Sequence, residues 1–132
     1  MKIITTNIRP IMIVSGALTC TMAYAAIAPQ AALLSSFGET LNGPLSEIVV
    51  RNWGALIALI GMMLIYGAFN PAVRSFSLTI AAISKLIFIV LVLFQGARYL
   101  GEPVGIAIAI DLVWVLLFAV YLVNKRPTAN LL

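Results

Sequence analysis

Four long apolar stretches divide the chain, and charged residues or prolines bound each of them. They cover residues 10–28, 52–70, 76–96 and 103–123. A membrane-spanning helix needs about 20 mostly apolar residues, because the hydrocarbon core of a bilayer is about 30 Å thick. Backbone amides find no water there, so each stretch is expected to be an α-helix. The pattern predicts an all-α fold: one domain over residues 1–132, built as an up-and-down bundle of four membrane-spanning helices.

The composition indicates lipid as the solvent of this chain. Hydrophobic residues make up 63% and charged residues 9%, with a mean hydropathy of +1.13. An ordinary globular domain is about 45–50% apolar and about 25% charged. There is no histidine and only one cysteine, Cys20, which excludes His-based triads, imidazole-bound haem and the usual zinc sites. We expect no metal and no cofactor. The net charge of +4 includes no basic run, so no nucleic-acid partner is expected either.

The charges outside the spans predict the orientation of the helices. Loops on the cytoplasmic side of a membrane carry an excess of Lys and Arg. With the N-terminus in the cytoplasm, the outer segments hold two arginines against three glutamates. The inner segments then hold five positive residues and no acid: Lys2, Arg9, Arg74, Lys125 and Arg126. We therefore expect a multi-pass protein of a bacterial inner membrane with both termini in the cytoplasm.

The first span has a second interpretation. Lys2, the following apolar run and "AYAAIA" are also typical of a signal peptide, with a cleavage site after Ala25 or Ala28. Pro29 directly follows Ala28 and disfavours cleavage there, whereas cleavage after Ala25 stays open. A retained first helix is the expected outcome.

Residues 29–50 form the only sizeable segment predicted outside the membrane. Leu33, Leu34, Phe37 and Leu41 are spaced as an apolar helical stripe. This spacing predicts a short amphipathic helix that lies at the outer interface and caps the bundle.

Small residues recur at helical spacing in the first two spans. In a membrane, helices associate through close packing and hydrogen bonds, and small residues let the backbones approach. We expect spans one and two to pack along this stripe, although it could instead form a homodimer surface. The stripe consists of Gly16, Cys20 and Ala23 in the first span and Gly54, Ala58, Gly61 and Ala68 in the second.

Two charged residues interrupt the third and fourth spans: Lys85 in "TIAAISKLIFIVLVLF" and Asp111 in "IAIAIDLVWV". Either charge at the centre of a membrane helix costs about 2.5–3.5 kcal/mol on the insertion scale. In antiparallel spans, Lys85 would lie about 13 Å and Asp111 about 18 Å from the inner face, an offset that a lysine side chain bridges. We predict that the two form an ion pair. The pair either fixes the packing of the two helices or serves a ligand, a partner or a translocated ion.

Further charged and polar residues cluster at the predicted outer ends of the spans. They are Glu47, Arg51, Asn52, Arg98 and Glu102, with Arg98 and Glu102 spaced four apart. We expect a solvated interface with modest ion pairs here rather than an anion-binding site.

Residues 50–96 resemble the BphX-like group of small bacterial membrane proteins. The likeness rests on a Trp-Gly start of the second span, on "YGAFNPAVR" as the inner turn and on "ISKLIFIVLV" in the third span. Length and four-span layout also match. The resemblance implies a bacterial membrane protein encoded near aromatic-ring-degradation genes and without an assigned activity. No site residue is transferred from it.

Three functions follow from these features. The leading hypothesis is a non-enzymatic membrane protein that acts through helix association, with itself as a homo-oligomer or with a larger membrane partner. The alternative is a small-molecule carrier or permeability factor that uses the Lys85/Asp111 pair. A membrane-bound enzyme is disfavoured because the sequence offers no paired acids, no nucleophile–base spacing and no metal ligands.

Overall fold

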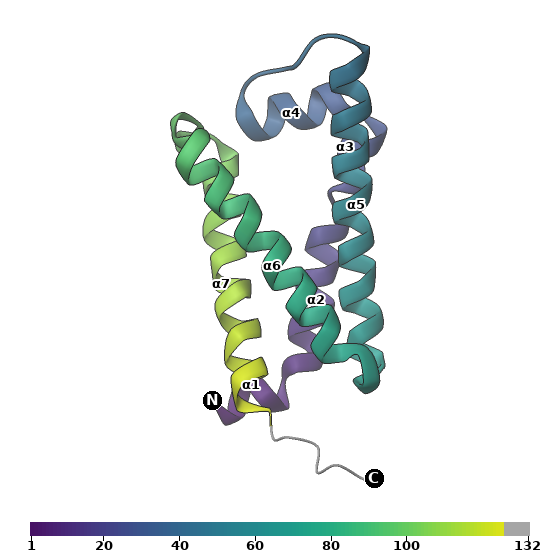
Figure 1. The fold of residues 1–132 in the computed structure, drawn as a ribbon, viewed down its shortest axis with the longest axis vertical. Helices are drawn as coiled ribbons and strands as arrows, with labels where there is room; N and C mark the ends of the chain where they lie inside the picture. The colour runs from purple at the N-terminus through teal and green to yellow at the C-terminus, as the bar shows by residue number, and fades with distance from the viewer. Residues whose placement is uncertain (126–132) are drawn as a thin grey trace.

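The computed structural model of the chain describes residues 1–125, and throughout that range it contains helices and no strand. Four segments are long and apolar enough to cross a membrane: Ile8–Ile27, Pro44–Phe69, Pro71–Gln95 and Pro103–Asn124. The predictions of an all-α chain and of four apolar spans are therefore confirmed. Figure 1 shows the four segments running up and down beside one another.

Eight helical elements make up the described chain. Four of them (α4, α5, α6 and α7) begin with a proline, which suits the first turn of a helix because the missing N–H would have no partner there. The elements are α1 (Lys2–Thr6), α2 (Ile8–Cys20), α3 (Ala23–Ile27), α4 (Pro29–Phe37), α5 (Pro44–Phe69), α6 (Pro71–Gln95), the 3₁₀ helix η1 (Ala97–Gly101) and α7 (Pro103–Asn124).

Two helices begin earlier than the apolar pattern predicts. α5 begins at Pro44 rather than at 52, and α6 begins at Pro71 rather than at 76. A charged residue ends an apolar run in the sequence, but it does not have to end a helix. Glu47 lies in the first turn of α5, where its negative charge interacts favourably with the helix dipole. With 26 residues, α5 is about 39 Å long and exceeds the thickness of a ~30 Å hydrocarbon core.

The segment before α5 forms a shorter helix than its apolar stripe predicts. α4 ends at Phe37 because Gly38 adopts a left-handed conformation with φ of 72°. Leu41 therefore lies in the following loop and is exposed, and Leu34 is exposed as well. The predicted four-residue stripe is wrong in these two members. Leu33 is buried, and α4 lies across one end of the bundle (Figure 1).

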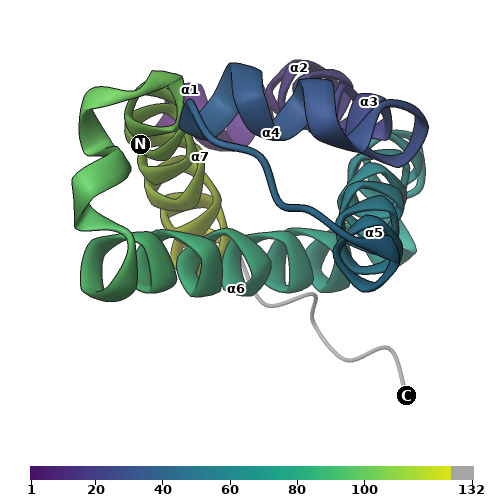
Figure 2. The same cartoon turned by 90° about the horizontal axis from the view of Figure 1, so that it is seen from above.

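The four spans form a ring rather than a closely packed square. α2 packs against α5, α5 against α6, and α6 against α7, whereas α7 does not pack along α2. α6 runs obliquely, from beside α5 at one end to beside α7 at the other (Figure 1), and seen from above it lies opposite α2 (Figure 2).

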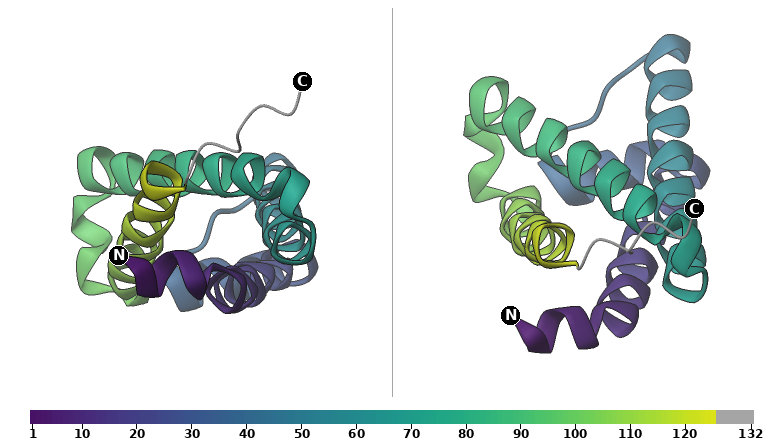
Figure 3. Two further views of the ribbon diagram at one scale, coloured as in Figure 1. Left: turned by 90° about the horizontal axis from the view of Figure 1, so that it is seen from below. Right: turned by 60° about the horizontal axis from the view of Figure 1, so that its bottom comes forward.

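Both ends of the described chain lie at the same end of the bundle (Figure 1). We call this end the inner end and the end at α4 the outer end; the two names refer only to these elements and not to a side of a membrane. α1 lies between α2 and the end of α7 there (Figure 3), and Nδ2 of Asn124 is 3.4 Å from Sδ of Met1. Four positive residues occupy this end and its turn: Lys2, Arg9, Arg74 and Lys125. Arg126, counted with them in the charge argument, lies outside the described residues.

Close backbone contact joins α2 to α5 along the small residues. A Cβ added to Gly61 would lie 2.6 Å from the carbonyl oxygen of Gly16, and one added to Gly54 would lie 2.7 Å from Cβ of Ala25. Sγ of Cys20 lies 3.6 Å from the carbonyl oxygen of Ala58. Ala23 lies in α3, beyond a break in the first span, and Ala68 is fully buried in the inner half of the bundle. The stripe is thus used within one chain.

Candidate functional site

Three polar side chains meet inside the bundle at mid-height. Nζ of Lys85 on α6 lies 2.6 Å from Oδ1 of Asp111 on α7. The same ammonium donates a 3.4 Å hydrogen bond to the hydroxyl of Thr19 on α2. The predicted Lys85–Asp111 pair is therefore present, and its lysine is buried. Lys85, Asp111 and Thr19 connect three of the four spans, and we call them the polar layer.

The first span is broken just above the polar layer. After Cys20 the backbone bonds tighten to three-residue spacing, with the amides of Thr21 and Met22 bonded to the carbonyls of Leu18 and Thr19. The hydroxyl of Thr21 also donates to the carbonyl of Leu18, and such side-chain bonds to the preceding turn bend helices. Mid-helix 3₁₀ turns of this kind often mark functional positions.

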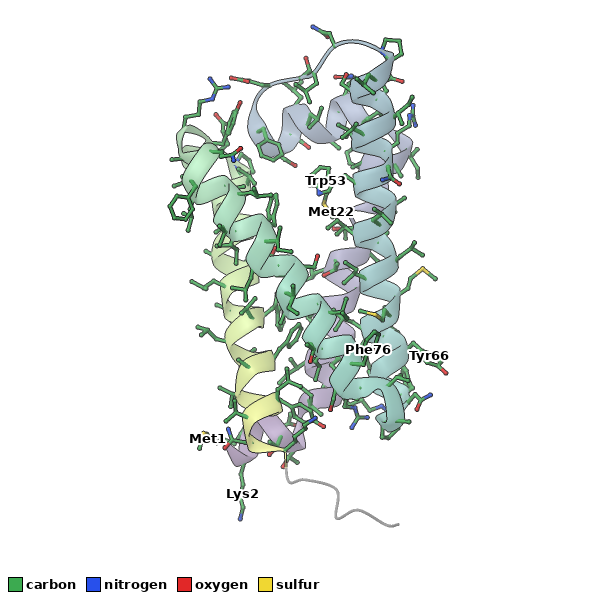
Figure 4. The ribbon with its side chains drawn as sticks, in the orientation of Figure 1. Met1, Lys2, Met22, Trp53, Tyr66 and Phe76 are labelled. Atoms are coloured by element: carbon green, nitrogen blue, oxygen red, sulfur yellow. The ribbon has the colours of Figure 1, made fainter. Side chains whose placement is uncertain are left out.

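A cavity of about 370 Å³ adjoins the polar layer in the outer half of the bundle. This volume falls within the range of about 300–1,000 Å³ that small-molecule sites occupy. Lys85, Asp111 and Thr19 all line it, and its walls are otherwise mostly apolar and aromatic, including Trp53 and Trp114. Figure 4 shows Trp53 and Met22 between α5 and the two helices opposite it. The polar layer is thus one wall of an open space and is not sealed between helices.

The inner half of the bundle is closed. Met12, Leu64, Leu78 and Phe118, one from each span, are completely buried and pack together there. A molecule in the cavity would therefore meet the polar layer and, behind it, a packed hydrophobic core. Within residues 1–125 this core closes the cavity toward the end of the bundle that carries the termini.

An aromatic cluster and α4 cover the outer end of the cavity. The rings of Trp53 and Phe88 connect α5 to α6 with centroids 6.3 Å apart. Phe37 of α4 contacts Trp53 at 6.4 Å and meets Tyr99 edge-on at 5.4 Å. Ser36 of α4 lines the cavity. α4 therefore acts as a cover over the site.

The predicted outer polar cluster is divided into two separate groups. On α5, Arg51 lies 3.9 Å from Glu47 and donates to the carbonyls of Ala26 and Ile27 at the end of α3. Asn52 is exposed and takes no part in these bonds. At η1, Arg98 pairs at 3.2 Å with a residue that the prediction left out, Glu39.

Arg98 pairs with Glu39 and not with Glu102, although Arg98 and Glu102 are spaced four apart in the sequence. Arg98 lies in a 3₁₀ helix and Glu102 just beyond its end, so a spacing of four does not align their side chains. Glu39 instead binds both Arg98 and the hydroxyl of Tyr99, the latter at 2.9 Å. The hydrogen bond to Tyr99 and the charge of Glu39 raise the pKa of Arg98 above its usual value. This exposed group ties the loop after α4 to the α6–α7 turn.

The Lys85–Asp111 pair could be predicted from the sequence, but Thr19, the third member of the polar layer, could not. Thr19 is one of several hydroxyl residues in the first span, and only the fold singles it out. Two further polar residues of the third span lie apart from the polar layer: Ser84 lines the cavity, and Gln95 is exposed at the end of α6. In residues 1–125 no three His, Cys, Asp or Glu side chains gather in a way that could hold a metal ion.

No protein-family model, curated protein or solved structure matches the chain.

Proposed function

We propose that this chain is a non-catalytic, membrane-embedded binding protein that holds a small, mainly apolar molecule in the cavity between its four spans. A carrier or permeability factor would use such a site. One observation carries the proposal: the Lys85–Asp111 pair faces a cavity of about 370 Å³ instead of being enclosed by neighbouring helices. A few convergent polar groups in an otherwise apolar pocket are typical of small-molecule sites.

The burial of the two charges supports a role in binding. The side chain of Lys85 is 9% exposed and that of Asp111 is 20% exposed, and both residues line the cavity. A pair that served only to hold α6 and α7 together would not need a cavity beside it. Intramembrane charges that line a cavity commonly mark ligand or ion sites.

The small-residue stripe gives little support to self-association of the chain, because contacts within the chain already occupy it. Gly16, Gly54 and Gly61 face residues of the same chain at distances that leave no room for a methyl group. A second copy could not use this surface without separating α2 from α5. The hypothesis that the chain acts by associating with a second copy or with a membrane partner stays a prediction. No contact within residues 1–125 supports it.

We further propose a bacterial inner membrane as the location, with both termini in the cytoplasm. The distribution of charge supports this orientation, because the end that carries the termini has positive residues and no acid. In this arrangement α4 lies at the outer interface, as expected of the amphipathic segment. The first span packs along α5 over its length, which supports a retained helix and not a cleaved signal peptide. Membership of the BphX-like group stays a prediction.

Native mass spectrometry of protein extracted gently from its own membranes tests the proposed function. We expect the wild-type protein to retain a bound small molecule, and the variant Lys85→Met/Asp111→Leu to lose it. The double change removes both charges, so it leaves no unpaired charge to disturb the fold. Lys125→Met is the matched control, because Lys125 is an exposed lysine whose only partner within residues 1–125 is Ser75, at 2.9 Å. A bare protein in all three samples, or a bound species that the double variant retains, would contradict the proposal.

A further inference from the structure

The cavity opens sideways, between α2 and α7. Its lining residues on α5 and α6 are buried or half-buried, whereas Leu18 on α2 and Ile110 on α7 are 50% and 44% exposed. Ala107, one turn from Ile110 on α7, also lines the cavity and is exposed. α2 and α7, which carry these exposed residues, are neighbours in the ring that do not pack along each other. The opening is therefore a gap in the ring of helices.

The two ends of this gap are closed. α7 meets α1 at the end that carries the termini and α4 at the opposite end. The gap thus forms a window at the level of the polar layer, bordered by apolar residues that face outward. In a chain whose spans are surrounded by lipid, such a window faces the hydrocarbon and not water.

The polar layer also restricts the charge of a ligand. Lys85 and Asp111 already compensate each other, so a further charge in the cavity would lie in a low-dielectric space without a counter-charge. An ammonium group has three N–H donors, and within residues 1–125 only two partners, Asp111 and Thr19, accept from Lys85. An uncharged group that accepts a hydrogen bond complements this arrangement.

We propose that the cavity takes up an uncharged amphiphile, an apolar molecule with one hydroxyl or carbonyl group, directly from the bilayer through the window between α2 and α7. The apolar body lies between Trp53, Trp114 and Phe88, and the oxygen accepts a hydrogen bond from Lys85. This inference rests on the proposed function and adds the class of ligand and its route of entry.

The chain carries its own reporters for a test. It contains two tryptophans, Trp53 and Trp114, and both line the cavity. A bromine atom quenches tryptophan fluorescence on contact, so a brominated ligand inside the cavity is detected directly. The probe is ω-bromoundecanol, with bromoundecyl sulfate and bromoundecyltrimethylammonium as charged probes of the same chain length. All three are added to the protein in phosphatidylcholine vesicles and compared at equal concentration in the membrane.

Saturable quenching by the alcohol is expected at a concentration at least about tenfold below that of either charged probe, because the headgroup of a charged probe would be buried without a counter-charge. In Lys85→Met/Asp111→Leu the alcohol loses its hydrogen-bond donor, so half-maximal quenching by the alcohol should need about ten times more of it. Quenching that does not saturate gives the background from probe dissolved in lipid. Equal or tighter binding of a charged probe would overturn the ligand class and leave the proposed function standing. If no probe quenches in a saturable manner and no molecule is retained in the native mass spectrum, both proposals fail.

The route is tested by the rate of quenching after vesicles that contain the alcohol are mixed with vesicles that contain the protein. Ala107→Phe fills the window and should lower the rate several-fold. Ala109→Phe is the matched control, because Ala109 lies on the same helix, is also exposed and does not line the cavity. Glu39→Gln loosens the tie that holds the cover formed by α4. Faster loading in Glu39→Gln, with no effect of Ala107→Phe, would overturn the lateral route in favour of entry from the outer end.

Discussion

Thr19 and Lys85 are joined by a 3.4 Å hydrogen bond, although they lie 66 positions apart on helices that do not pack along each other. Lys85 extends from α6 across the bundle toward α2 while its ammonium also pairs with Asp111 of α7. The lysine thus spans the interior at the point where the packed inner core ends and the cavity begins. Its length allows one side chain to connect three helices around an open space.

The contribution of this bond can be measured by replacing Thr19 with valine. Thr19→Val keeps the shape of the side chain and removes the hydroxyl that accepts from Lys85. Thr79→Val is the matched control, because both hydroxyls donate to the carbonyl four residues earlier at 2.8 Å, but Thr79 is exposed and has no lysine partner. We expect Thr19→Val to lower the free energy of unfolding by about 1 kcal/mol more than the control. Equal losses in denaturant titrations of the detergent-solubilised variants would show that the bond contributes nothing.

Removing one member of the ion pair should cost far more than removing both. Lys85→Met or Asp111→Leu leaves one charge without its partner, and breaking a buried pair on one side costs about 3–5 kcal/mol. We expect values within this range, because each charge loses the one opposite charge that it contacts within residues 1–125. The double variant should recover most of the loss in thermal unfolding. Additive losses of the two single variants would mean that the charges do not stabilise each other.

The contact between α2 and α5 should not tolerate a methyl group. In Gly61→Ala the new Cβ would lie 2.6 Å from the carbonyl oxygen of Gly16, so the two backbones must separate. Overpacking of this kind costs about 1–3 kcal/mol. Gly101→Ala is the control, since nothing lies within 4 Å of the position of its Cβ. If Gly61→Ala melts at the same temperature as the control, the close contact between α2 and α5 does not contribute to the stability of the fold.

The proposed orientation predicts opposite accessibility of two single cysteines. In a Cys20→Ser background, Thr40→Cys places a thiol in the loop after α4, and Ala72→Cys places one at the start of α6, in the turn after α5. Both positions are exposed. A membrane-impermeant maleimide added to intact cells should label Thr40→Cys and should label Ala72→Cys only after permeabilisation. The reverse pattern would place the termini outside.

The apolar pattern alone determined the number of spans and their approximate limits. Hydrocarbon offers no water to backbone amides, so an apolar stretch of sufficient length has to be a helix. The Lys85–Asp111 pair followed from the same pattern, because a fixed rise per residue in antiparallel helices gives the depth of each charge. The approach of spans one and two was likewise indicated by their small residues, since glycine is visible in a sequence as a place where backbones can meet.

Only the tertiary structure shows how the four helices are arranged around the cavity beside Lys85 and Asp111. The sequence indicates the depth of a residue along its own helix, but the tilt of α6 and its place opposite α2 depend on packing over the whole bundle. For this reason Thr19 as a partner of Lys85, the cavity beside the ion pair and the window between α2 and α7 could not be predicted. Arg98 pairs with Glu39 instead of Glu102 for the same reason. The loop after α4 folds onto η1, and this contact between distant segments brings the carboxylate of Glu39 within reach of Arg98. The depth of a residue along its own helix follows from its position in the sequence, because the rise per residue is fixed. The arrangement of helices around a cavity instead depends on contacts between segments that are distant in the sequence.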